Sequence, residues 1–402
     1  MKTRAAVAQS ILDVPLSGVR EIAEMALGMK NVLRLYFGES NIPTAEYLKR
    51  AAQNAMAEGH TFYTSNAGSM SLRTQICRYY DCKHSVTLDP AADVMATSSG
   101  IQSLYLAIRC VLDPGDHALM LTPQWPNASS IAKMSCATVT EVAMVRHGRH
   151  FQIDFDALEA AVTPRSRLLV YTSPSNPLGW VATPADQQNL LDFARRHNLW
   201  LLADEVYERL YYPQQQDGQA SAVPPSILTK ADKDKDAVLV AQSFSKAYSM
   251  TGWRLGWLAG RKDLIARAAA MNEYIMSCPA SFTQRAAEVA LAEGELHIEQ
   301  MLAQLRSNRD LCLAALQKMP GMDIPAADGA FYLFPKIEGL TNSLAFCKRL
   351  LTETGVGIAP GGAFGAGGEG SLRICYAAEP AILTEALSRL DQYLRHRAVH
   401  LD

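Results

Sequence analysis

The sequence predicts an α/β fold in which helices cover both faces of a mostly parallel β-sheet, with a smaller α+β domain beside it. Short apolar runs in the middle of the chain lack strict alternation of polar and apolar residues, as expected of strands buried on both faces. Segments with apolar residues at helical spacing separate several of these runs. Strand and helix therefore alternate along the chain, which is typical of a parallel sheet with helical connections.

Five apolar runs are the predicted strands, and they cover residues 93–97, 117–121, 167–171, 199–203 and 237–241. One predicted helix, residues 184–197, carries Leu190, Leu191 and Ala194 at helical spacing. Polar and aromatic residues follow all five runs. Because open sheets of this kind bind ligands beyond the carboxyl ends of their strands, we expect a ligand site there.

The C-terminal part of the chain has a different pattern, with long amphipathic helices over residues 293–318 and 343–354. Short strands are predicted near residues 330–335 and 371–376. We therefore expect two domains. The large domain covers residues 46–289, and the smaller α+β domain combines residues 1–45 with residues 290–402.

Composition restricts the kind of partner. The chain has 402 residues, of which 49% are apolar and 19% charged, as in a globular protein with a large core. Its 38 Lys and Arg residues nearly balance 40 Asp and Glu residues, which gives a net charge of −2. No charge excess points to a nucleic acid or an anionic membrane, so small molecules are the expected partners.

Eight cysteines are scattered singly along the chain without a Cys-x-x-Cys pair, as in a reduced, cytoplasmic protein. Cys77, Cys82 and His84 come nearest to a metal cluster, but no second cluster supplies a fourth ligand, so we expect no metal. Residues 1–10 lack the apolar core of a signal peptide, and no run of about 18 apolar residues occurs. The cytoplasm is therefore the expected location.

The most informative motif is Ser-Phe-Ser-Lys at residues 243–246, which follows the fifth predicted strand. Lys246 is flanked by hydroxyl groups and is followed by Arg254, so it can be an amine nucleophile beside an anion site. A surface lysine is the alternative interpretation. The neighbours of Lys246 are small, hydroxylated and aromatic, whereas a surface lysine usually has charged neighbours.

Residues 243–256 resemble the lysine motif of the class I and II aminotransferases, which are fold-type I pyridoxal-phosphate enzymes: Ser-x-Ser-Lys, then Gly-x-Arg-x-Gly. Further landmarks follow in family order from residues 35–39 to residues 371–374. The resemblance implies a mostly parallel, seven-stranded sheet between layers of helices.

The resemblance also implies a role for each residue of the cofactor site. Lys246 holds the aldehyde of pyridoxal 5′-phosphate as an internal Schiff base. The phosphate is held by side chains of the lysine motif and by backbone N–H groups that follow Gly100 at the start of a helix over residues 102–112. These phosphate contacts come from Ser243, Ser245, Arg254, Ile101 and Gln102.

Around the cofactor ring, the resemblance implies that Asp204 keeps the pyridine nitrogen protonated, which makes the ring an electron sink. Tyr207 and Asn176 would contact the ring oxygen. Trp125 stands where relatives stack an aromatic side chain on the ring.

For the substrate, the resemblance implies that Arg373 grips the α-carboxylate through two parallel donors, assisted by Gly38 and Asn176. Tyr63 would reach the phosphate site of a partner chain, so a homodimer with shared active sites is expected. Residues 11–19 would help to complete the side-chain pocket.

The implied activity moves an amino group from an amino acid to a 2-oxo acid. Ile101 stands where some relatives that use acidic substrates carry Lys, so a neutral or apolar amino acid with broad tolerance is favoured. The alternatives are a carbon–sulfur β-lyase on the same fold and, less favoured, a non-catalytic pyridoxal-phosphate-binding module. Such modules carry a DNA-binding region ahead of this fold, for which the sequence leaves no room.

Overall fold

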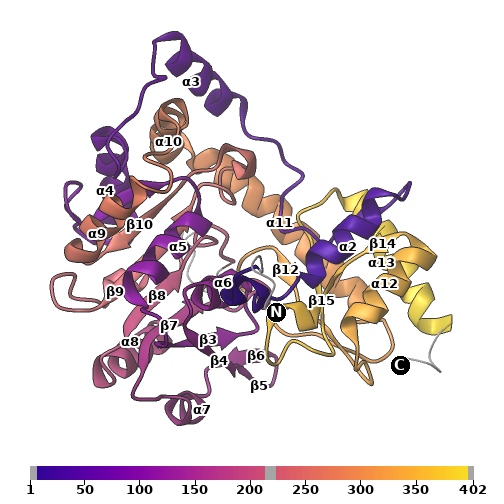
Figure 1. Ribbon diagram of the computed structural model, residues 1–402. Coiled ribbons are helices and arrows are strands. Elements are labelled where there is room, and N and C mark those ends of the chain that lie inside the picture. The colour runs from indigo at the N-terminus through magenta and orange to yellow at the C-terminus, as the bar shows by residue number, and fades with distance from the viewer. Residues whose placement is uncertain (1–6, 213–222, 397–402) are drawn as a thin grey trace, which may run out of the picture.

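The computed structural model describes residues 7–212 and 223–396, so residues 1–6 and 397–402 of the predicted smaller domain lie outside it. Its centre is a seven-stranded sheet in the order β2-β10-β9-β8-β7-β3-β4 (Figure 1). The strands are β2 (Val94–Thr97), β3 (His117–Thr122), β4 (Thr138–Ala143), β7 (Ser166–Thr172), β8 (Trp200–Asp204), β9 (Val238–Ser243) and β10 (Gly256–Gly260). The predicted seven-stranded α/β fold is confirmed.

The sheet is parallel except at β10, which runs antiparallel to both β2 and β9. The five predicted runs correspond to β2, β3, β7, β8 and β9. The sequence did not predict β4 or β10. As an edge strand, β4 is only partly buried and carries polar residues such as Thr140 and Glu141, and β10 begins and ends with glycine, so neither forms an apolar run.

Helices cover both faces of this sheet. On one face lie α5 (Gly100–Val111), α6 (Asn127–Met134) and α9 (Lys262–Asn272), and on the other lie α4 (Met70–His84), α8 (Pro184–Arg196) and α10 (Ser281–Glu293). Side chains of β7 alternate between two apolar cores, with Leu169 and Tyr171 in one and Leu168 and Val170 in the other. Strands with apolar residues on both faces therefore account for the absence of polar alternation in the sequence.

A second lobe, at the right of Figure 1, gathers α2, α12 and α13 around short strands. Its helices are α2 (Gly18–Leu27), α11 (Glu295–Leu316), α12 (Ser343–Thr354) and α13 (Pro380–His396). Its strands are β1 (Leu33–Arg34), β11 (Met322–Asp323), β12 (Tyr332–Leu333), β13 (Lys336–Ile337), β14 (Val356–Gly357), β15 (Ala359–Pro360) and β16 (Leu372–Cys375). Because β1 pairs with β14, an N-terminal segment lies within the C-terminal lobe, beside its helices.

The remaining elements are short or peripheral. They are α1 (Gln9–Leu12), α3 (Glu46–Ala57), α7 (Phe155–Ala160), the hairpin of β5 (Val145–His147) and β6 (His150–Gln152), and the 3-10 helices η2 (Ile227–Thr229), η3 (Thr251–Trp253) and η4 (Gly361–Phe364). α3 packs against α10 at the top of Figure 1. Over residues 7–212 and 223–396, no helix has both the length and the apolar character needed to cross a bilayer.

The predicted break after residue 289 falls inside α10, which continues to Glu293. The chain turns instead at Gly294, so the helix predicted over residues 293–318 is α11 and begins at Glu295. A Cβ atom at position 294 would lie 2.6 Å from Cε1 of Tyr248, so only glycine fits this turn without displacing that ring. The division into residues 46–289 against the rest of the chain stays a prediction.

Candidate active site

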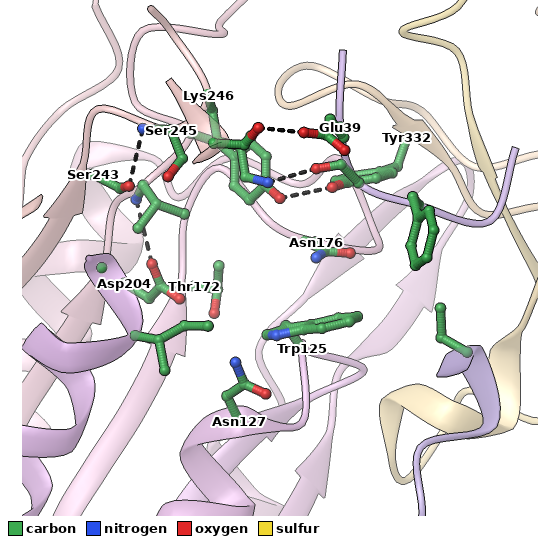
Figure 2. A pocket seen from close by; sticks show the side chains of 18 of the residues that line it. Glu39, Trp125, Asn127, Thr172, Asn176, Asp204, Ser243, Ser245, Lys246 and Tyr332 are labelled. Atoms are coloured by element: carbon green, nitrogen blue, oxygen red, sulfur yellow. Dashed lines mark hydrogen bonds between the residues drawn. The ribbon is translucent and has the colours of Figure 1, made fainter. Parts of the chain in front are cut away.

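A cavity of about 550 Å³ lies where β7, β8 and β9 end, between the large sheet and the second lobe (Figure 2). It brings together residues that lie far apart in the sequence, from the N-terminal segment to β16. The predicted residues that line it are Gly38, Gly100, Ile101, Trp125, Asn176, Asp204, Tyr207, Ser243, Ser245, Lys246, Arg254 and Arg373. Of the predicted site residues, Tyr63 and Gln102 do not line it.

Lys246 follows β9 and is half-buried in the wall of this cavity. Its Nζ donates a hydrogen bond to the Gly38 carbonyl oxygen and lies 5.6 Å from the centroid of the Tyr207 ring. Desolvation lowers the pKa of Lys246 to about 8, and the charges of Arg373 and Arg254 act in the same direction. A substantial fraction of this amine is therefore unprotonated at slightly alkaline pH, as a nucleophile or base requires.

Asp204 is the last residue of β8 and is buried at the base of the cavity. Its Oδ1 accepts a hydrogen bond of 3.3 Å from the backbone N–H of Val206. Burial raises the pKa of Asp204 to about 6, although this hydrogen bond and the Lys246 charge act against the rise. A cationic ligand group beside this carboxyl would favour its ionised form.

Tyr207 lies in the turn after β8, and its hydroxyl shares a hydrogen bond of 2.7 Å with the hydroxyl of Tyr332. Both tyrosines are buried, and burial raises the pKa of each, so both hydroxyls are neutral. Tyr332 belongs to β12 in the second lobe. The pair therefore joins the two lobes at the cavity.

Arg373, on β16, is 1% exposed. It donates to Asn176 Oδ1 at 3.1 Å and to the Tyr36 carbonyl oxygen, while its Nε has no hydrogen-bond partner among the described residues. Nor does it form an ion pair with any carboxylate in residues 7–212 and 223–396. A buried guanidinium that faces a cavity without a paired carboxylate favours an anionic ligand.

The start of α5 forms another wall. Gly100 is its first residue, and a Cβ atom there would lie 3.1 Å from the Ser243 Cβ. The helix begins two residues earlier than predicted because Ser99 is its N-cap and accepts the backbone N–H of Gln102 at 3.1 Å. The Gln102 N–H group predicted to contact phosphate is therefore engaged in capping, whereas Ile101 lines the cavity.

This geometry agrees with the comparison with known proteins. The sequence profile of aminotransferase class I and II matches residues 31–390. The chain belongs to this family. An aspartate aminotransferase of Pyrococcus horikoshii is 31% identical over 98% of each chain. An aromatic-amino-acid aminotransferase of Thermococcus litoralis is 31% identical over 95% of this chain and 96% of its own.

Solved structures agree with this assignment. Aspartate aminotransferase from Thermus thermophilus, solved with maleate, superposes on this aminotransferase with a TM-score of 0.88 at 28% identity. The match covers 96% of this chain and 99% of that chain. Members of the family act on amino acids and 2-oxo acids.

Tyr63 of this aminotransferase lies outside the cavity and is 87% exposed. Phe62 beside it is 81% exposed, and Tyr274 is 89% exposed. The loops that carry these aromatic side chains are joined by a hydrogen bond of 2.7 Å from Asn66 to Glu273. These two connected loops expose three aromatic side chains, Phe62, Tyr63 and Tyr274, which we call the aromatic patch.

Several residues that line the aminotransferase cavity were not predicted from the sequence. They are Arg20, Tyr36, Phe37, Glu39, Leu104, Asn127, Thr172, Val206, Thr251 and Tyr332. Some of them could have been found from the sequence, because residues 36–39 fall within the family landmark at residues 35–39 and Leu104 lies one helical turn after Gly100. Nothing in the sequence pointed to Arg20 and Tyr332, since only long-range packing brings them to the cavity.

Proposed function

We propose that this aminotransferase uses pyridoxal 5′-phosphate, held as an imine on Lys246. The observation that carries the proposal is the half-buried Lys246 amine, with its pKa lowered to about 8, in the same cavity as the buried Asp204 carboxyl. Both groups are costly to keep there in charged form without a ligand. Perturbed amines and carboxyls in one cavity are typical of catalytic sites.

The residues present fit this cofactor. Asp204 would pair with the pyridine nitrogen, and Tyr207 and Asn176 would donate hydrogen bonds to the ring oxygen. Trp125 would cover the ring. Ser243, Ser245, Arg254 and the N–H of Ile101 would hold the phosphate at the start of α5, where aligned backbone dipoles favour an anion.

When bound, pyridoxal phosphate supplies an electron-withdrawing ring that stabilises the carbanion formed when the substrate loses its α-proton. The chain's own contribution is to place and move that proton. As a free amine, Lys246 Nζ would remove the proton from the substrate Cα and later return it. Asp204 keeps the ring cationic as an ionised carboxylate.

Arg373 would hold the substrate α-carboxylate, with Gly38 and Asn176 beside it. The rest of the cavity contains apolar surface from Phe37, Ile101 and Leu104. This lining supports a neutral or apolar amino acid, with broad tolerance, as the amino donor.

The second substrate differs in chemistry, because the cavity also contains Arg20. The Arg20 guanidinium lies 5.9 Å from the centroid of the Phe37 ring and forms no ion pair with the described carboxylates. A cation above an aromatic ring at the cavity rim suits the distal carboxylate of a dicarboxylic 2-oxo acid. We propose that such an acid accepts the amino group.

A homodimer with shared active sites completes the proposal. The patch of Phe62, Tyr63 and Tyr274 would be covered by a second copy of the chain, because exposed aromatic clusters of this kind mark protein interfaces. Tyr63 would then reach the partner's phosphate site.

The test is reduction of the cofactor-loaded protein with borohydride, followed by peptide mass analysis. The peptide that contains Lys246 should gain the mass of a reduced pyridoxyl phosphate group, and the Lys246→Ala protein should gain none. An unmodified Lys246 peptide in protein that binds the cofactor would contradict the proposal.

A panel of amino donors with pyruvate, 2-oxoglutarate and oxaloacetate tests the substrate. Release of pyruvate, ammonia and thiol from sulfur amino acids, without transfer to any oxo acid, would identify a β-lyase instead.

A further inference from the structure

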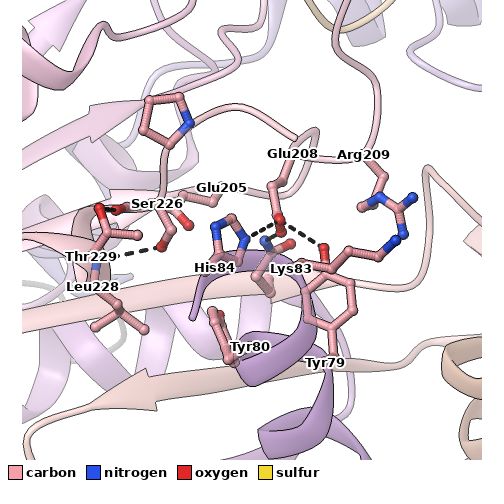
Figure 3. A network of polar contacts seen from close by, with 12 residues as sticks. Tyr79, Tyr80, Lys83, His84, Glu205, Glu208, Arg209, Ser226, Leu228 and Thr229 are labelled. Atoms are coloured by element: carbon pink, nitrogen blue, oxygen red, sulfur yellow. Dashed lines mark hydrogen bonds and ion pairs between the residues drawn. The ribbon is translucent and has the colours of Figure 1, made fainter. Parts of the chain in front are cut away.

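A buried polar network lies outside the cavity lining, where the end of α4 meets the turn after β8 (Figure 3). At its centre are Glu208 and His84, whose side chains are 3% and 2% exposed. His84 is the last residue of α4, and Glu208 follows Tyr207 in the turn after β8. Neither residue lines the cavity.

Glu208 accepts three hydrogen bonds, which come from two different elements, α4 and β9. One carboxylate oxygen accepts from His84 Nε2 at 2.5 Å and from the Tyr79 hydroxyl at 2.7 Å. The other accepts from the Gln242 side-chain amide. Gln242 belongs to β9 and directly precedes Ser243, so one carboxylate connects α4, the turn after β8 and the end of β9.

Glu208 and His84 form an ion pair. Burial by itself would raise the pKa of Glu208, but the hydrogen bond from His84 and its charge hold that pKa below its ordinary value. Burial by itself would lower the pKa of His84, but Glu208 keeps it raised. Glu205 lies nearby, and burial and the Glu208 charge raise its pKa to about 8, so it is mostly neutral at pH 7.

Each of the two connected segments contributes some residues to the cavity lining and others to the network. In the segment after β8, Asp204 and Tyr207 line the cavity, whereas Glu208 enters the network. At the end of β9, Ser243 lines the cavity, whereas Gln242 enters the network. The hydrogen bond between Glu208 and Gln242 therefore constrains the distance between the cavity-lining groups of the two segments.

We propose that Glu208 is a positioning residue for the reaction. Through its bonds to Gln242 and His84, it fixes the positions of Asp204 and Tyr207 relative to Ser243 and Lys246. Charge-assisted hydrogen bonds in dry surroundings are short and directional, so they hold the attached backbone more rigidly than apolar contacts would. Groups behind a site that orient its contacting residues contribute to affinity and rate in this way.

This inference rests on the proposed function, and the experiment separates the two. The variants are Glu208→Gln, which removes the charge while keeping the shape, and Gln242→Leu, which removes only the connection to β9. The control is Asp236→Asn, because Asp236 is a buried carboxylate that forms a bidentate pair with Arg195 ahead of β9, at the end away from the cavity. For each protein, the dissociation constant of pyridoxal phosphate from the apoprotein, kcat, KM and the thermal midpoint are measured.

Glu208→Gln and Gln242→Leu should each weaken pyridoxal phosphate binding at least fivefold and lower kcat at least tenfold, with KM within threefold of the unmodified value. Asp236→Asn should lower the thermal midpoint while the dissociation constant and kcat stay within twofold. If Glu208→Gln does not fold, Gln242→Leu decides alone. The inference would be overturned if both variants kept the cofactor affinity and kcat of the unmodified protein. It would also be overturned if Asp236→Asn lowered cofactor affinity and kcat as much as they do. An unmodified protein that binds no pyridoxal phosphate would instead overturn the proposed function.

Discussion

The hydroxyl groups of Tyr207 and Tyr332 lie 2.7 Å apart and share one hydrogen bond in the lining of the cavity. Tyr207 belongs to the turn after β8 of the large sheet, and Tyr332 belongs to β12 of the second lobe. Both side chains are buried, so solvent does not readily supply a replacement partner. The position of the Tyr207 hydroxyl therefore depends on how the second lobe packs against the sheet.

Tyr332→Phe removes this partner while keeping the ring. We expect kcat to fall about fivefold, since one neutral hydrogen bond contributes about 1 kcal/mol. Steady-state kinetics measure the change. Tyr376→Phe is the control, because the Tyr376 hydroxyl bonds to the Ala330 carbonyl oxygen at 3.2 Å and Tyr376 does not line the cavity. Equal losses of kcat in the two variants would count against a specific role for Tyr332.

Asp204→Asn should stabilise the cofactor-free protein while abolishing most activity. The folded-state pKa of Asp204 is about 6 against an ordinary value of 3.8, so ionising it costs folding free energy, and that cost grows as the pH rises through this interval. The free energy of unfolding of the variant should exceed that of the unmodified protein by about 3 kcal/mol at pH 8 and by roughly half as much at pH 5. Chemical denaturation at both pH values tests this expectation, and a gain that shrinks with rising pH would refute it.

Arg373→Lys keeps the positive charge but replaces two parallel donors with one ammonium group. We expect kcat/KM for the amino donor to fall about 100-fold, because bidentate contacts to a carboxylate are lost. The kcat/KM for amino alcohols, which lack the carboxylate, should fall far less. Arg395→Lys, in the exposed last turn of α13, is the matched control. If amino acids and amino alcohols lost activity equally, Arg373 would have a structural role only.

Arg20→Ala tests the second substrate. We expect kcat/KM for 2-oxoglutarate to fall about tenfold, while the value for pyruvate stays within twofold, because only the former carries a distal carboxylate. A parallel loss for both acceptors would show that Arg20 acts on the shape of the cavity instead. Thermal midpoints should stay close to that of the unmodified protein, since Arg20 is exposed and forms no ion pair in the described part of the chain.

Much of this site could be predicted because its residues follow strands or sit in local motifs. Asp204, Ser243 and Lys246 come at or after the ends of apolar runs, and parallel strands bring such ends to one edge of a sheet. Residues of the second lobe are different. Tyr332 approaches Tyr207 across a separation of 125 residues, and its own strand shows nothing of that contact.

The sequence by itself therefore determined the fold class, the family and the residues that follow each strand, because burial periodicity and motif order are local properties of the chain. Tertiary structure alone decided that Gln102 caps its own helix, that Arg20 reaches the rim and that Glu208 binds His84 and Gln242 outside the cavity lining. These relationships depend on which side of a turn faces which neighbour. Long-range packing fixes that choice, and no single segment encodes it.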